Sequence, residues 1–68
     1  SPHNARAANN LGIARAYACD AAGAARAFER AIRLAPDDPL PEINLELLRR
    51  GELPGVPAGC AAALPSAP

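Results

Sequence analysis

The sequence lacks most of the residue types from which catalytic and metal sites are built. Its 68 residues include no Lys, Met or Trp and only one Phe, one Tyr and one His. His3 has no Cys or carboxylate at ligand spacing, which argues against a metal or acid–base site. There is also no glycine-rich phosphate loop, no nucleophile elbow and no Ser-His-Asp set that three helices can assemble. We therefore expect a protein that is not an enzyme, binds no metal and needs no cofactor.

Neither sign of charge is in excess. Seven Arg balance seven Asp and Glu, so the formal net charge is zero. Because a nucleic-acid-binding domain carries a clustered basic surface, we expect no nucleic acid partner. No stretch approaches the roughly 20 apolar residues that a spanning helix needs, so we expect no direct membrane span. The use of Arg as the sole cation, with abundant Ala and Pro, is typical of GC-rich bacterial genomes.

Large apolar side chains are also scarce. Hydrophobic residues make up 50% of the chain, but alanine dominates them. A chain of this length hides only about 60% of its surface on folding, and each Ala removes little area from water at about 25 cal/mol per Å². The sequence starts at Ser1 and not at Met. Self-association, docking on a larger body or further repeats of a longer chain can each complete so small a core. Of these we expect a larger complex or a longer chain.

Helix formers and helix breakers alternate in a way that predicts three helices, over residues 4–18, 22–34 and 39–50. Asp20 can accept a hydrogen bond from the first free amides of the second helix, and Pro36 cannot continue it. Asp37 and Asp38 precede Pro39, which favours the start of the third helix. Gly51 can adopt the left-handed conformation that ends it. We expect an all-α helical unit over residues 1–51.

Two of these helices have an apolar side. In the first, the expected buried stripe is Ala8, Leu11, Gly12 and Ala18. In the second, one side carries Ala24, Ala27, Phe28, Ala31 and Leu34, and the other carries Arg26, Glu29, Arg30 and Arg33. The spacing of Glu29 and Arg33 predicts an ion pair along the helix. These patterns favour a short antiparallel helical hairpin.

Residues 52–68 differ in composition from the rest. They hold four of the eight prolines, Gly55, Gly59 and a single charge, without a periodic apolar face. We expect an irregular, extended tail rich in Pro, Gly and Ala. Two interpretations stay open: a disordered terminus, or a segment that lies along the helices or a partner and is anchored by Leu53, Val56 or Leu64.

The two cysteines allow two states. Cys19 ends the first predicted helix and Cys60 lies in the tail. In an extracytoplasmic compartment they can form a disulfide that ties the tail to the hairpin, worth about 3 to 4 kcal/mol. In the cytosol Cys19 is a small buried residue and Cys60 a free thiol. The length of the tail and the weak core motivate the bridge. The compartment is not determined, with a periplasmic or extracytoplasmic one slightly favoured.

The helical region resembles the tetratricopeptide repeat family. The resemblance rests on its L-G, A-x3-F and terminal Pro elements, found here as Leu11, Gly12, Ala24, Phe28, Ala31 and Pro36. Asn10-Leu11 recurs as Asn44-Leu45, an offset of 34 residues (44 − 10) that equals the repeat length. The signature aromatics are absent, with Ala8 and Arg15 in their places. The resemblance implies one full repeat and a third helix that caps it.

Members of that family hold peptides or proteins on the inner face of the first helix of each pair. Carried over by position, this face comprises Arg6, Asn9, Asn10, Ile13, Ala16, Tyr17, Asn44 and Leu47. Asn10 and Asn44 stand out because an amide side chain can both donate to and accept from a peptide backbone. The alternative is that both are ordinary helix-surface residues of the repeat.

Two functions follow as hypotheses. The first is a non-catalytic protein–protein interaction or assembly module that binds a protein or peptide through this face. The second is a structural accessory subunit packed permanently on a large bacterial membrane, secretion or pilus complex, through the tail and Ile43, Leu45, Leu47 and Leu48. A weaker resemblance, to small exported repeat proteins of bacterial secretion and pilus machines, suggests the second setting.

Overall fold

Three α-helices and one 3-10 helix account for the regular structure of this protein. The computed structural model describes residues 2–64, and Ser1 and residues 65–68 lie outside it. The elements are α1 (Pro2–Tyr17), α2 (Ala21–Leu34), α3 (Leu40–Arg49) and the 3-10 helix η1 (Ala58–Ala63). No strand occurs between residues 2 and 64, so the expected all-α fold is confirmed. The three α-helices begin and end within two residues of their predicted limits.

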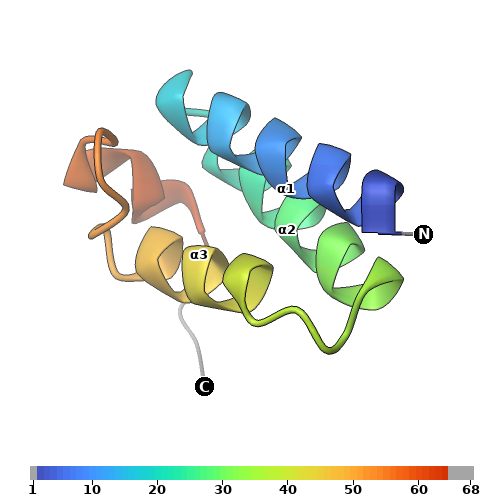
Figure 1. Ribbon diagram of the computed structural model, residues 1–68. Helices are drawn as coiled ribbons and strands as arrows, with labels where there is room; N and C mark the ends of the chain where they lie inside the picture. Colours follow the sequence, from blue (N-terminus) through green and yellow to red (C-terminus); the bar gives the residue numbers. More distant parts are fainter. Residues whose placement is uncertain (1, 65–68) are drawn as a thin grey trace.

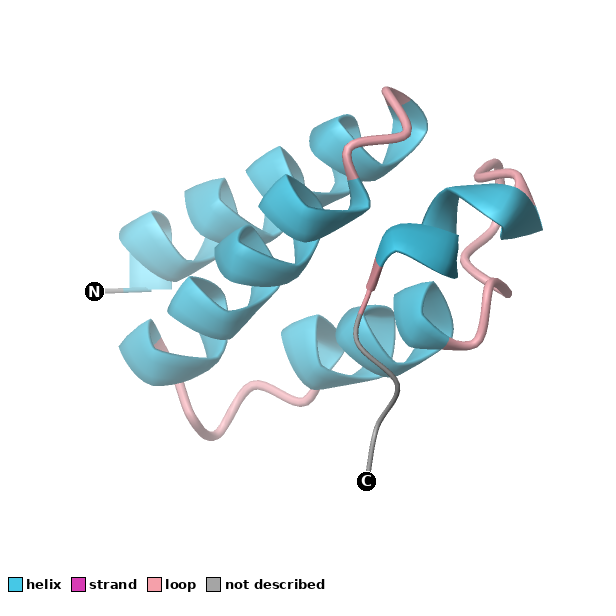
Figure 2. Ribbon diagram, turned by 180° about the vertical axis from the view of Figure 1, so that it is seen from behind, coloured by secondary structure: helices cyan, strands magenta, loops and turns pink. Residues whose placement is uncertain are grey.

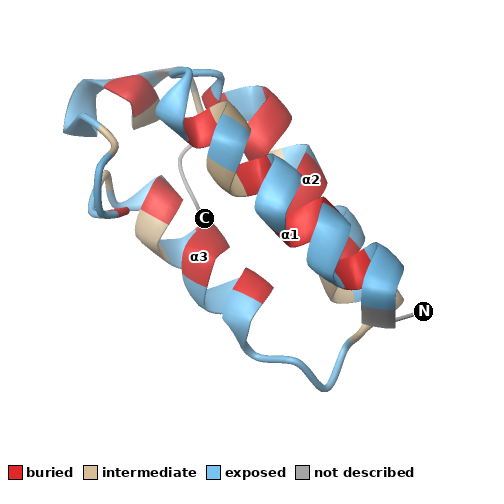
Figure 3. Ribbon diagram, turned by 45° about the horizontal axis from the view of Figure 1, so that its top comes forward, coloured by how far each residue is buried: buried red, intermediate tan, exposed pale blue. Residues whose placement is uncertain are grey.

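The first two helices form an antiparallel hairpin, and α3 packs mainly on α2 (Figure 1). After α3 the chain turns back, so that η1 lies near the end of α3 and towards the α1–α2 turn, as the view from behind shows (Figure 2). Buried positions of α3 lie on its side towards the hairpin (Figure 3). The three α-helices therefore share one core.

The α1–α2 turn is set by local backbone chemistry. Cys19 has a φ of 61°, the left-handed conformation that usually selects glycine. The amides of Cys19 and Asp20 donate to the carbonyls of Ala16 and Arg15, respectively, which closes the end of α1. Asp20 Oδ1 then accepts from the Gly23 amide at 3.0 Å, as the sequence predicts for the start of α2.

The core is built around Phe28, whose side chain is completely buried. Gly12 of α1 lies against its ring, which allows the two helices to approach closely. The predicted side of α2 faces inward, with Leu34 half-buried and the other members buried. The core cluster consists of Ala16, Ala21, Ala24, Phe28, Leu45, Leu48 and Leu53.

The expected buried stripe of α1 is partly wrong. Ala8 and Gly12 are buried, but Leu11 is 45% exposed and Ala18 is exposed. The stripe that meets α2 and α3 instead consists of Ala5, Ala8, Asn9, Gly12 and Ala16. Alanines occur on several sides of α1, so more than one side is apolar. The size of the side chains on α2 and α3 decides which side of α1 is buried. The small side chains at the true stripe leave room for Phe28.

The third helix starts and ends with recognisable caps. Asp38 Oδ1 accepts from the Leu40 amide at 3.0 Å, and Pro39 stands at the N-cap. At the other end Gly51 has a φ of 69°, which confirms the predicted left-handed cap. The amides of Gly51 and Glu52 donate to the carbonyls of Leu48 and Leu47. Local sequence therefore determines where α3 begins and ends.

The described part of the tail packs on the helices. Leu53 is buried in the core cluster, and Val56 and Leu64 pack against it, so all three expected anchors make contact. Within residues 52–64, Ala58–Ala63 form η1, which the expectation of an irregular tail did not include, and the other residues form no helix or strand. A short alanine-rich run between prolines is compatible with one or two 3-10 turns.

Candidate interaction surface

The residues predicted to bind a partner come together where α1 meets α3. Arg6, Asn9, Asn10, Ile13 and Tyr17 recur on one side of α1 at helical spacing. Asn44 and Leu47 lie on α3, and Asn44 Nδ2 donates to Asn9 Oδ1 at 3.1 Å across 35 residues of sequence. We call this set of seven residues the α1–α3 face. Its two halves, from different helices, are joined by that hydrogen bond.

Asn9 and Asn44 are structural at the centre of this face. Their side chains are buried, and within residues 2–64 no buried side-chain nitrogen or oxygen lacks a hydrogen-bond partner. A buried amide without a partner costs about 1 to 3 kcal/mol, so this pair holds α1 and α3 in register. The structure thus corrects the expectation that Asn44 offers a free amide to a partner.

The other members of the face differ in how much they present to solvent. Arg6 and Asn10 are exposed, whereas Ile13 and Leu47 are half-buried against the core. Tyr17 is 61% exposed, and one side of its ring lies beside Gly55 of the tail, close enough that a Cβ there would be 3.0 Å from Cε1. Asn10 therefore remains the one exposed amide of the predicted set.

Exposed apolar side chains mark the outer side of α3. Leu40 is 50% exposed and Ile43 51%. Leu45 and Leu48, which the accessory-subunit hypothesis places at a partner interface, are instead buried in the protein's own core. Leu45 follows the buried Pro41 by four residues, so both lie on the inner side of the helix, and Ile43 points elsewhere. Sequence reasoning missed Leu40 because it stands at the helix start.

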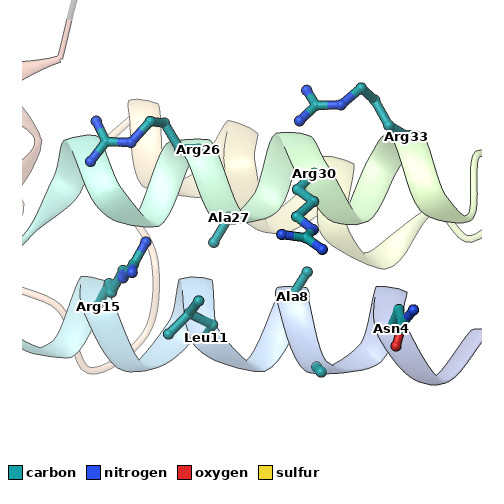
Figure 4. Close-up of a pocket in the computed structure, with 9 residues that line it drawn as sticks. Asn4, Ala8, Leu11, Arg15, Arg26, Ala27, Arg30 and Arg33 are labelled. Carbon is teal, nitrogen blue, oxygen red and sulfur yellow. The ribbon is translucent and has the colours of Figure 1, made fainter.

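A second surface feature is a groove of about 500 Å³ between α1 and α2. Four arginines line it: Arg15 from α1 and Arg26, Arg30 and Arg33 from α2. Arg15 and Arg30 reach towards each other's helix across Ala8, Leu11 and Ala27 (Figure 4). We call it the arginine groove. The arginine spacing of four and three residues along α2 is visible in the sequence, where it indicates only a solvated helix side.

The predicted ion pair between Glu29 and Arg33 does not form. Among residues 2–64 the one ion pair joins Arg50 Nε to Glu46 Oε1 at 3.1 Å, and both side chains are largely exposed. Arg15 Nη1 donates to the Gly23 carbonyl at 3.5 Å, which is a long contact. The arginines of the groove consequently have no carboxylate partner among the described residues.

Cys19 and Cys60 form a disulfide in the structure, with their Cα atoms 5.1 Å apart. It links the α1–α2 turn to η1 across 41 residues. Cys60 is buried, whereas Cys19 stands at the exposed turn. The bridge thus holds the tail beside Tyr17, at one end of the α1–α3 face.

The described residues offer neither a metal site nor a membrane-spanning helix. Between residues 2 and 64 no three His, Cys, Asp or Glu side chains are grouped as metal ligands. In the same part of the chain, each helix is too short or too polar to cross a bilayer. None of the protein-family models, curated proteins and solved structures compared with this chain matches it.

Proposed function

We propose that this protein is a non-catalytic protein–protein interaction module of the tetratricopeptide type, and that it binds a peptide segment through the α1–α3 face. The observation that carries the proposal is the hydrogen bond between Asn9 and Asn44. It sets the first helix of the expected repeat beside the first helix of the partial copy. The contact between Gly12 and Phe28 supports the same assignment, because small and large residues of the repeat pattern meet there.

The chemistry of the face suits a peptide that is not strongly apolar. Asn10 is exposed and can both donate to and accept from a peptide backbone. Arg6, one turn earlier on α1, is exposed and can bind a carboxylate. Ile13 and Leu47 are half-buried and offer a small apolar contact between these polar groups. We propose a peptide with an acidic group or a free C-terminus as the ligand.

A random peptide library displayed on phage tests this proposal, because it samples many peptide sequences without a chosen partner. Peptides selected on the wild-type protein are then measured against Arg6→Ala/Asn10→Ala, which alters only exposed side chains. Loss of one charged and one neutral hydrogen bond is expected to weaken binding about tenfold or more. Arg49→Ala is the matched control, because Arg49 is exposed and lies two residues after Leu47, on the opposite side of α3.

The outcomes separate clearly. Weaker binding by the double variant with unchanged binding by Arg49→Ala supports the α1–α3 face. Equal affinity of all three proteins for the selected peptides, or a library that yields no binder, contradicts it. Circular dichroism, which measures helix content, verifies that the double variant is folded.

Exposure of Leu40 and Ile43 favours a second candidate function, that of an accessory subunit packed on a large bacterial complex. Leaving two large apolar side chains of one short helix in water costs free energy, at about 25 cal/mol per Å² of exposed apolar area. A disulfide persists in oxidising compartments, which supports a periplasmic or extracytoplasmic setting for either function. A chain that stays folded and monomeric at all concentrations in sedimentation experiments would argue against this second function.

A further inference from the structure

The arginine groove concentrates positive charge on a molecule whose net charge is zero. Four of the seven cations line it, and no Asp or Glu does. The one ion pair of the described residues, between Glu46 and Arg50, is on α3 and uses none of these arginines. Arg15 and Arg30 reach into the groove (Figure 4), and none of its four arginines is in an ion pair among the described residues, so an anionic group that enters the groove meets unpaired cations.

The groove is also apolar along its base. Ala8 and Ala27 are buried there, and Leu11 is 45% exposed within the groove. A free inorganic anion satisfies the arginines but leaves Leu11 in water. The combination therefore selects an occupant that carries both carboxylates and apolar side chains, such as an acidic amphipathic helix end.

This chain itself contains such a segment. Residues 37–43, which we call the acidic corner, hold three carboxylates, Asp37, Asp38 and Glu42, and the two exposed apolar side chains Leu40 and Ile43. Within residues 2–64 none of the three carboxylates is in an ion pair. The corner projects from the body of the molecule, where the α2–α3 loop passes into α3 (Figure 1).

The acidic corner does not fill the groove of its own molecule. All residues that line the groove come from α1 and α2, and none comes from α3 or the loop before it. We propose that the groove receives the acidic corner of a second copy of this chain. Leu40 and Ile43 then cover Leu11, and the carboxylates of the corner pair with the arginines.

This contact is heterologous, because the two surfaces that meet are different parts of the molecule. Each copy gives its corner to one neighbour and its groove to another, so copies associate head to tail. Zero net charge allows this approach without general repulsion between copies. The groove lies apart from the α1–α3 face, but Leu40 and Ile43 share one stripe of α3 with Leu47 of that face. Peptide binding is therefore measured on Arg26→Gln/Arg30→Gln, which leaves this stripe unchanged, so that failure of association and failure of peptide binding are told apart.

The test uses two half-blocked variants of the whole chain and sedimentation velocity. Arg26→Gln/Arg30→Gln removes two cations from the groove and leaves the corner intact. Leu40→Ser/Ile43→Ser removes the apolar contacts of the corner and leaves the groove intact. All four side chains are exposed, so both variants are expected to fold. Arg49→Gln/Arg50→Gln is the matched control, since it removes two exposed arginines at the end of α3, neither of which lines the groove or belongs to the α1–α3 face.

Wild-type protein and the control are expected to show a mass that rises with concentration beyond that of a dimer. Their association constant should fall about tenfold or more when salt is raised from about 0.02 M to about 0.5 M. Each half-blocked variant alone should remain a monomer at concentrations where the wild type associates. An equimolar mixture of the two should form a one-to-one dimer and nothing larger, because only one groove and one corner remain.

Three results would overturn the proposal. A wild-type chain that is monomeric up to millimolar concentration excludes contact between copies and also argues against the accessory-subunit function. A half-blocked variant that still self-associates indicates that two copies meet through the same surface on each molecule, and not groove to corner. A mixture of the two half-blocked variants that contains only monomers also rules out groove-to-corner contact. To exclude misfolding as the cause, the mixture is repeated with Asp37→Asn/Glu42→Gln, a milder corner variant, in place of Leu40→Ser/Ile43→Ser. This second mixture must also contain only monomers.

Discussion

The ring of Phe28 occupies the space that a side chain at Gly12 would need. A Cβ placed on Gly12 would lie 2.5 Å from Cε1 and 2.6 Å from Cδ1 of that ring. Phe28 is completely buried, so it has no room to move away. This contact decides how closely α1 approaches α2, and with it the position of everything that α1 carries.

We expect Gly12→Ala to destabilise the protein although it raises helix propensity. Alanine gains about 1 kcal/mol over glycine inside a helix, whereas forcing a methyl group into a filled core costs about 1 to 3 kcal/mol. The cost of crowding the core should exceed the gain in helix propensity. We therefore expect the free energy of unfolding, measured in urea, to fall by about 1 kcal/mol. Gly59→Ala is the control, since no atom lies within 4 Å of its added Cβ. A more stable Gly12→Ala variant would show that Phe28 does not limit the approach.

The pair formed by Asn9 and Asn44 predicts a thermodynamic coupling. Asn44→Ala leaves the buried Asn9 amide without its partner, which should cost about 1 to 3 kcal/mol. The double variant Asn9→Ala/Asn44→Ala should cost less than the sum of the two single variants, because no unpaired group remains. Asn10→Ala, at an exposed neighbouring position, should change stability by less than about 0.5 kcal/mol. Strict additivity in this double-mutant cycle would mean that the hydrogen bond contributes nothing.

The cap of α2 gives a smaller and more local effect. Asp20→Ala removes the acceptor for the Gly23 amide and should cost about 1 kcal/mol. Asp37→Ala, at an exposed position in the α2–α3 loop, is the charge-matched comparison and should be nearly neutral. Thermal unfolding followed by circular dichroism measures both. Equal destabilisation by the two variants would assign the effect to net charge and not to capping.

Local features of this fold were predictable, because they depend on residues close together in sequence. Asp20, Pro36 and Gly51 mark helix ends through their own backbone or side-chain chemistry, and the helices end near them. The inner side of α2 was also predictable, since Phe28 and its alanines contrast sharply with Arg26, Arg30 and Arg33.

Features that depend on how helices are placed in space were not predictable. The sequence favours a core position for Leu11 because α1 is apolar on several sides, and only the packing of Phe28 against Gly12 turns Leu11 outward. The Asn9–Asn44 pair needs α1 and α3 to be adjacent, which no local pattern encodes. The arginine groove likewise needs Arg15 of α1 to lie beside the arginine-bearing side of α2, opposite Arg26 in Figure 4.

Reduction of the Cys19–Cys60 disulfide should lower stability more than any single substitution above. The bridge closes a loop with a sequence separation of 41 residues, and the chain-entropy relation then gives about 4 kcal/mol. Stability measured in urea with and without reductant checks this, and Cys19→Ser/Cys60→Ser should be insensitive to reductant. Oxidised and reduced wild-type protein with the same midpoint of unfolding would show that the bridge does not form in solution.

The same experiment has a local readout at Tyr17. Tyr17 is the one tyrosine of a chain that has no tryptophan, so its fluorescence has no competing source. Its ring lies beside Gly55, in the part of the tail that the disulfide holds against the α1–α2 turn. Reduction should free the tail and change the fluorescence of Tyr17 at concentrations of urea where the helices are still folded. Loss of both signals together would instead mean that tail and helices unfold as one cooperative unit.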